Sequence, residues 1–271
     1  MTFIDTFYKV LIKRSLITKF NLGTVNDYYS QRNNKYVKTI KGKKGTTTAN
    51  ANTMCNFTVL CEGFDLAGWR LPSGDYSQAE DNLMDFTIKN ALKKDSWFAK
   101  KMPALWKAWC IDGAEYNSAT GKWEEPYWPN EIHDVMAYYS NEWLGCSNAD
   151  KFNDSCLIKD IVNQIYNNKI PVPISVKFGN LNHIILLTGF ENNLSETQFE
   201  SSLETGFPNI VNFIYDDPYG AFNWQANKYL SDRGSGNDQI LPYNLFIECA
   251  KPFGNQKIKW AHIINKPAAL V

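Results

Sequence analysis

The segment PVPISVKFGNLNHIILLTGF, residues 171–190, decides the fold of this 271-residue chain. Residues 171–178 are rich in β-branched side chains and are bounded by prolines, and residues 183–190 are almost entirely apolar. Both features predict buried β-strands, and the Gly179-Asn180 pair between them is a turn signal. We therefore expect two strands of an antiparallel sheet here.

Outward from this segment, the chain divides into a helical part and a strand part. After a polar connection over 191–208, residues 210–215 predict a further strand that ends in an Asp-Asp-Pro-Tyr-Gly run. Earlier in the chain, apolar spacing predicts a buried helix that begins at Cys55, mostly helical structure over 77–150 and a helix over 156–168. Helices followed by an antiparallel sheet indicate an α+β fold.

Two segments of the helical part depart from this pattern. The polar, turn-rich residues 24–54 predict a loop or a short ribbon, and residues 111–130 predict a hairpin or loop. No repeat or linker divides the chain, so we expect one bilobal domain over 1–271. Its parts are an N-terminal helix, a mainly helical lobe and a sheet lobe, over 1–22, 23–168 and 169–271.

The N-terminal helix is predicted to be amphipathic. Its apolar face holds Phe3, Phe7, Val10, Leu11 and Ile17. A helix that docks on its own domain is the favoured interpretation, and a helix that binds a partner or a membrane surface is the alternative. The segment has no uninterrupted apolar stretch and no small-residue cleavage site, so we expect no signal peptide and synthesis in the cytoplasm.

Composition excludes several classes of protein. The 28 basic and 28 acidic residues give a formal net charge of zero, which argues against a nucleic-acid binder. No apolar run approaches the roughly 18 residues of a membrane span. The six cysteines include no Cys-x-x-Cys pair and the chain has no His-Glu-x-x-His motif, so we expect free thiols, no metal and no cofactor.

Cys55 is the candidate nucleophile. At the first turn of a helix, unpaired backbone N–H groups and the helix dipole favour a thiolate, which is the reactive form of cysteine. Any histidine that acts on it is one of three: His133, His183 or His262. His183 opens a predicted strand, where it lies at the rim of the sheet, whereas the other two fit structural roles better.

Two further side chains complete the candidate site. If strands 183–190 and 210–216 are antiparallel neighbours, then Asp217 or Asp216 lies beside His183. A carboxylate on one ring nitrogen fixes the tautomer and leaves the other nitrogen for the thiol. Gln31, upstream of the nucleophile, offers a side-chain amide that donates to an oxyanion together with the backbone N–H of the cysteine.

The order and spacing of these motifs resemble those of the papain-like cysteine peptidases, and more closely those of the C39-like branch. That branch shows an upstream Ser-Gln, a Cys-Gly-Pro-Thr helix start, a Pro-Val strand, a strand with His and Gly six residues apart, and a terminal Asp-Pro-Tyr-Gly. The counterparts are Ser30-Gln31, Cys55-Asn56-Phe57-Thr58, Pro171-Val172-Pro173, His183 with Gly189, and Asp217-Pro218-Tyr219-Gly220. The chain departs from the pattern at Asn56-Phe57 and in its long loop between Gln31 and Cys55.

The resemblance implies a papain-like fold with a helical lobe and an antiparallel sheet lobe. It also implies a peptidase with a Cys55–His183–Asp217 triad, an acyl-enzyme, no cofactor and a peptide or peptidoglycan substrate. Trp123 and Trp128, in the predicted loop, are candidates to line the substrate groove.

The resemblance leads to several hypotheses about the biological role. Arginine is rare beside lysine, which is typical of AT-rich genomes, and this favours a phage or prophage murein endopeptidase. Such an enzyme is released to the cell wall by lysis or is carried in a virion, and it can have a virion or lysis-system partner. The alternatives are a non-catalytic virion protein that retains the fold, a protein-processing peptidase, and transfer to an amine in place of hydrolysis.

Overall fold

The computed structural model describes about half of the chain, including most of the predicted sheet lobe. The described residues are 18–23, 28–34, 38–42, 45–49, 55–68, 80–81, 95, 100, 115–117, 122–124, 156–206, 209–231, 235–250, 257–258, 261 and 263. Within these ranges the fold is mixed α/β, with four α-helices and a five-stranded antiparallel sheet.

The long strand β8 (Leu181–Asn192) organises the sheet. Along one edge it pairs first with β7 (Val172–Phe178) and then with β1 (Thr18–Asn21), and along the other edge it pairs with β9 (Ile210–Asp216). Strand β12 (Gln239–Pro242) pairs with β9 and completes the order. The predictions of strands at 171–178, 183–190 and 210–215 and of a turn at Gly179-Asn180 are therefore confirmed.

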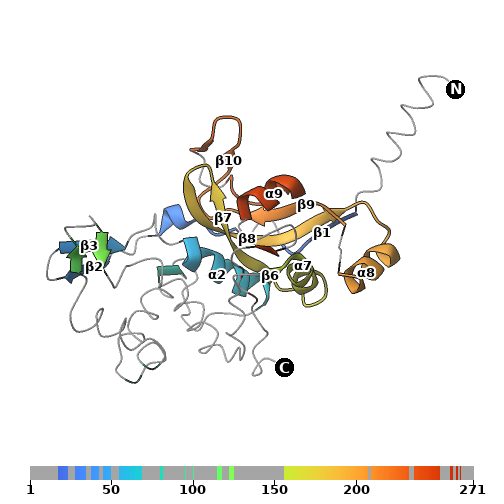
Figure 1. The fold of residues 1–271 in the computed structure, drawn as a ribbon, viewed down its shortest axis with the longest axis horizontal. Helices are drawn as coiled ribbons and strands as arrows, with labels where there is room; N and C mark the ends of the chain where they lie inside the picture. The colour runs from blue at the N-terminus through green and yellow to red at the C-terminus, as the bar shows by residue number, and fades with distance from the viewer. Residues whose placement is uncertain are drawn as a thin grey trace.

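Helices pack on the sheet from two sides (Figure 1). Helix α2 (Cys55–Leu66) buries Val59 against Ile184 and Leu186 of β8. The alternate residues of the strand, Ile185 and Leu187, belong to the main core instead, as expected from the two-residue period of a strand.

The main core extends to two further helices of the described chain. From α9 (Tyr243–Ala250), the Phe246 ring packs 4.3 Å from the ring of Phe213 on β9. Helix α7 (Ile158–Tyr166) contributes a row of fully buried aliphatic side chains: Ile158, Ile161, Val162 and Ile165. The helix that we predict to begin at Cys55 is thus confirmed, and the helix predicted over 156–168 is confirmed for Ile158–Tyr166.

Four short two-stranded ribbons lie outside the main sheet among the described residues, and three of them concern predictions made from the sequence. Strands β2 (Lys38–Gly42) and β3 (Gly45–Ala49) form the ribbon alternative predicted for 24–54. Strands β4 (Glu115–Asn117) and β5 (Lys122–Glu124) form the hairpin predicted within 111–130. Residues Cys156–Leu157, placed by the sequence in a helix, form strand β6, which pairs with β13 (Lys257–Ile258).

The structure corrects two further predictions. The N-terminal helix predicted over 1–22 does not include its last residues, because Thr18–Asn21 form β1; residues 1–17 lie outside the described residues. Phe20 stacks on Phe190 of β8 with ring centroids 5.6 Å apart, so tertiary pairing overrides a helical spacing that continues only weakly past residue 17.

The second correction concerns the predicted polar connection over 191–208, which contains helix α8 (Glu196–Glu204). Its start is a capping box, in which the side chain of Ser195 accepts from the backbone of Gln198 and the Gln198 side chain accepts from the backbone of Ser195. One buried residue, Phe199, anchors the helix on the core. The predicted helical structure over 77–150 lies mostly outside the described residues.

Candidate active site

The candidate nucleophile lies at the first residue of α2. Cys55 is half-buried, whereas residues 56–64 behind it are all buried. Its side chain packs against the cluster of Val59, Ile184 and Leu186, so the packing of α2 on β8 fixes the position of the thiol. In general, the backbone N–H groups in the first turn of a helix have no partner within that helix, and a helix N-terminus stabilises an anion.

His183, the third residue of β8, joins this thiol to a carboxylate. Its Nε2 lies 2.7 Å from Oδ1 of Asp217, which leaves Nδ1 as the ring nitrogen for the cysteine. Burial alone lowers the pKa of His183, but the charge of Asp217 and hydrogen bonds with Asp217 and Cys55 outweigh burial and raise this pKa to about 10. The imidazole is therefore held in a setting that favours its protonated form.

Asp217 is fixed from several directions. Its Oδ1 also accepts from the backbone N–H of Tyr219 at 2.8 Å, and its Oδ2 accepts from the hydroxyl of Tyr229 at 3.1 Å. Its backbone carbonyl accepts from the hydroxyl of Tyr28 at 2.6 Å, and its N–H donates to the carbonyl of Gly236 at 2.9 Å. A Cβ on Gly236 would lie 2.1 Å from the Asp217 carbonyl, so this close approach requires glycine.

The neighbouring Asp216 has a different environment. Its Oδ1 accepts from the backbone N–H of Asp238 at 2.6 Å, and its carboxyl interacts with Glu62 of α2. Of the two aspartates that the sequence leaves as alternatives, Asp217 is therefore the one that contacts His183. The antiparallel register of β8 and β9 explains the difference, because Asp216 is paired with Leu186 and the next residue turns toward the start of β8.

Gln31 lies on a segment that is tied to both sides of the site. It opens the 3₁₀ helix η1 (Gln31–Asn33), and its side chain is buried. Its N–H donates to the carbonyl of Pro218 at 2.9 Å. Three residues later, the Asn34 amide donates to the Thr58 hydroxyl on α2 at 3.2 Å. These bonds hold the Gln31 segment between the Asp217 turn and the nucleophile helix.

The remaining candidate residues cannot be assigned to the site. Trp123 lies on β5, opposite Tyr116 of β4. Trp128, His133 and His262 lie outside the described residues.

The tyrosines that surround the candidate triad were not predicted from the sequence. The rings of Tyr219 and Tyr229 meet the His183 ring edge-on, with centroids 6.4 and 5.9 Å away. Tyr219 belongs to the Asp-Pro-Tyr-Gly run and could have been weighed for that reason. No local signal distinguishes Tyr229 or Tyr28, because each reaches the aspartate only through the tertiary fold.

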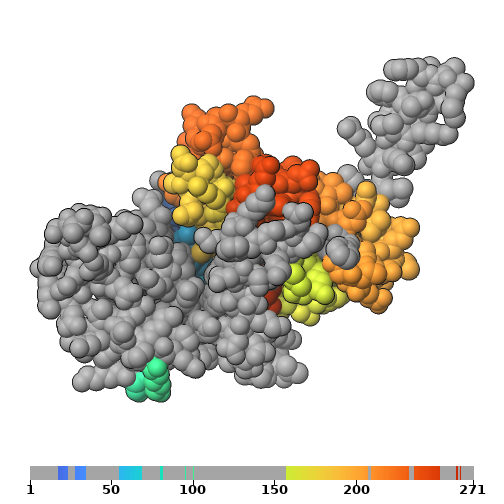
Figure 2. All heavy atoms as spheres, viewed as in Figure 1, coloured from blue at the N-terminus to red at the C-terminus, as the bar shows by residue number. Residues whose placement is uncertain are grey.

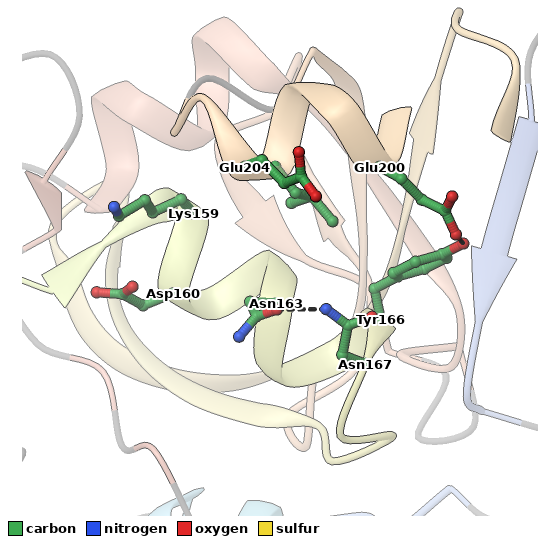
Figure 3. Close-up of a pocket in the computed structure, with 8 residues that line it drawn as sticks. Lys159, Asp160, Asn163, Tyr166, Asn167, Glu200 and Glu204 are labelled. Atoms are coloured by element: carbon green, nitrogen blue, oxygen red, sulfur yellow. Dashed lines mark hydrogen bonds between the residues drawn. The ribbon is translucent and has the colours of Figure 1, made fainter. Parts of the chain in front are cut away.

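A separate pocket of about 450 Å³ lies between α7 and α8 (Figure 3). Both helices lie side by side at the surface in the space-filling view (Figure 2). The side chains that line the pocket are mostly polar or charged: Lys159, Asp160, Asn163, Tyr166, Asn167, Glu200, Leu203 and Glu204. None of the candidate catalytic residues lines the pocket, so the pocket is separate from the candidate active site.

Neither a metal-binding cluster nor a membrane-spanning helix occurs among the described residues. In those ranges, no group of three or more histidine, cysteine, aspartate or glutamate side chains is arranged to hold a metal ion. In the same part of the chain, no helix combines the length and the apolar character that a membrane crossing requires.

Comparison with known proteins gave no relative. The chain matches no protein-family model, and no curated protein and no solved structure is significantly similar to it.

Proposed function

We propose that the protein is a cysteine peptidase with a papain-like fold. The observation that carries this proposal is His183, whose ring interacts with Asp217 through Nε2 at 2.7 Å and with the thiol at the start of α2. A cysteine, a histidine and a carboxylate in this order form the arrangement that activates a thiol for attack on an acyl group.

The proposed reaction uses the groups of the chain alone. His183 takes the proton of Cys55 at Nδ1, and the thiolate attacks the carbonyl carbon of an amide. The backbone N–H of Cys55 and the side chain of Gln31 donate to the oxyanion. The imidazolium then protonates the leaving amine, and an acyl-enzyme forms. Water, deprotonated by His183, attacks this thioester and releases the carboxylic acid and the thiol.

Asp217 holds the imidazole throughout this cycle. Its carboxylate accepts a hydrogen bond from Nε2–H, fixes the tautomer with Nδ1 toward the thiol and stabilises the imidazolium. The hydrogen bonds that fix Asp217 itself preserve this orientation, and preorganisation of this kind favours the transition state.

The substrate class that we propose is a peptide of the bacterial cell wall, cut by an endopeptidase of phage or prophage origin. Its support is the sequence resemblance described above. The test is incubation of the purified protein with sacculi, followed by mass spectrometry of the fragments. We expect new amino termini; unchanged fragments, or new reducing sugar ends, would contradict the assignment.

Substitution of the nucleophile tests the peptidase chemistry itself. In Cys55→Ala, activity should fall by about 10⁴-fold or more, because no other group can form the acyl-enzyme. Cys61→Ala is a matched control, since Cys61 is buried in the same helix, and it should retain most of the activity. Iodoacetamide should label Cys55 well below pH 8. A thiol that reacts only at alkaline pH would favour a non-catalytic protein that retains the fold.

A further inference from the structure

Tyr229 lies beside the triad on an element that the sequence does not associate with it. The hairpin of β10 (Phe222–Asn223) and β11 (Lys228–Tyr229) follows the Asp217 turn, and Tyr229 pairs with Phe222 at its base. The tip of this hairpin packs on the β7–β8 turn, since a Cβ on Gly179 would lie 2.6 Å from Oδ1 of Asn227. The hairpin is labelled at β10 in Figure 1.

The hydroxyl of Tyr229 donates to Oδ2 of Asp217, the carboxylate oxygen that does not contact His183. Oδ1 of Asp217 accepts from His183 and from the backbone N–H of Tyr219, at 2.7 and 2.8 Å. Oδ2 accepts from the Tyr229 hydroxyl at 3.1 Å. Because donors fix both oxygens, the plane of a fully buried carboxylate is determined, and Oδ1 stays directed at the imidazole.

The ring of Tyr229 contacts the histidine as well as the carboxylate. It meets the His183 ring at an interplanar angle of 76° with centroids 5.9 Å apart, and the Tyr219 ring at 4.9 Å. Rings in such edge-on contact stabilise one another and exclude water from the pair that they enclose. One side chain thus restrains both partners of the His183–Asp217 contact.

The hairpin that carries Tyr229 is also joined to the Gln31 segment. Nη1 of Arg32 donates to the carbonyls of Leu230 and Ser231 at 3.1 and 3.3 Å, and its guanidinium lies over the Tyr219 ring at 4.1 Å. Leu230, the neighbour of Tyr229, is therefore hydrogen-bonded to Arg32, the neighbour of Gln31.

We propose that Tyr229 is a positioning residue of the triad, which orients Asp217 through its hydroxyl and restrains His183 through its ring. The inference rests on the proposed Cys–His–Asp chemistry. Without the hydroxyl, Oδ2 of a buried carboxylate loses a donor, and the carboxylate turns away from Nε2. The imidazolium is then less stabilised, and so is the thiolate that it accompanies.

The test measures the rate of iodoacetamide labelling of Cys55 against pH, in the full chain, by mass spectrometry. Tyr229→Phe keeps the ring and removes only the hydroxyl. Since a hydrogen bond to a charged group contributes at least a factor of ten, labelling at pH 6 should slow roughly tenfold, and the profile should move about one pH unit upward. Tyr229→Leu, which also removes the ring, should shift the profile further.

Tyr166→Phe is the matched control, because its hydroxyl bonds to Glu196 and Glu200 on α8, away from the triad; its profile should match the wild type. A merely structural role of Tyr229 would lower the melting temperature and leave the pH profile in place, and that result would overturn the proposal. If the wild-type thiol itself shows no labelling below pH 8, the proposed function and this inference both fail. Activation in the wild type with an unchanged Tyr229→Phe profile overturns this inference alone.

Discussion

At the scale of single residues, the charge of Asp217 decides the state of His183. Burial opposes a charged imidazole, and a neighbouring carboxylate favours it. The pKa of about 10 results because the carboxylate and the hydrogen bonds with Asp217 and Cys55 outweigh burial. At neutral pH this setting favours the imidazolium, which is the form of His183 that a thiolate–imidazolium pair with Cys55 would contain.

Asp217→Asn should reverse this balance. With the charge removed, burial prevails, and the pKa of His183 should fall below its ordinary value of about 6.5. In the wild type, the contribution of His183 to the free energy of unfolding is fully present below about pH 6.5 and is lost as the pH rises through about 10. The variant should lack this contribution.

The measurement is an NMR titration of the histidine side chains, of which the chain has three. Asp216→Asn is the control, because Asp216 accepts from the backbone of Asp238 and not from His183. It should leave the His183 titration close to that of the wild type. An unchanged His183 titration in Asp217→Asn would show that the carboxylate does not control the imidazole.

At the scale of elements, a buried carboxyl joins the nucleophile helix to the strand that carries Asp217. Glu62, on α2, has no exposed surface. Burial and the charge of Asp216 raise the pKa of Glu62 well above its ordinary value. Two buried carboxyls close to each other are stable when one of them is protonated, so we expect a proton to be held between α2 and the end of β9.

Glu62→Gln should change how stability depends on pH. A raised pKa in the folded state means that the contribution of Glu62 is present below its unfolded pKa of about 4.3 and is lost as the pH rises through the folded value. The wild type should therefore lose more stability between pH 5 and pH 9 than the variant does. Urea unfolding across this range measures the difference.

Glu204→Gln provides the comparison, since Glu204 is exposed on α8, and its curve should follow the wild type. Parallel pH curves for the wild type and Glu62→Gln would show that no proton is held between α2 and β9.

At the scale of the whole molecule, the site is built from segments that are far apart in the chain. The residues near Gln31, the start of α2, the start of β8, the turn after β9 and the β10–β11 hairpin all meet at one end of the sheet. The first strand of the chain also belongs to that sheet, because β1 pairs with the far half of β8. Gly189 makes this pairing possible, as a Cβ there would lie 2.2 Å from the carbonyl of Phe20.

Removal of β1 should destabilise the whole sheet. A chain that starts at Leu22 exposes the edge of β8 and the Phe190 ring that Phe20 covers, whereas a chain that starts at Thr18 keeps both. We expect the shorter chain to melt lower by several degrees, about what the loss of a few kcal/mol of packing produces. Equal melting temperatures for the two chains would contradict a structural role for β1.

The sequence by itself determined the elements whose signals are local. The period of the apolar residues predicts the Val172–Phe178 and Ile210–Asp216 strands and the buried helix from Cys55, and turn chemistry predicts the turn at Gly179. The pairing of neighbouring strands brings the Asp216–Asp217 pair to His183, so the approach of one of these two carboxylates to the histidine was predictable as well. The capping box at Ser195 is also local, and α8 could have been predicted from it.

Other features of the fold and the site depend on contacts between segments that are distant in the chain. The sequence cannot choose between Asp216 and Asp217, because the choice depends on the register of β8 and β9. The sequence also cannot predict that Thr18–Asn21 form a strand. That strand depends on pairing with the open edge of β8, which lies more than 160 residues further along the chain. Tyr28, Glu62 and Tyr229 reach the site by such long-range contacts, in which packing and burial, and no local periodicity, bring the groups together.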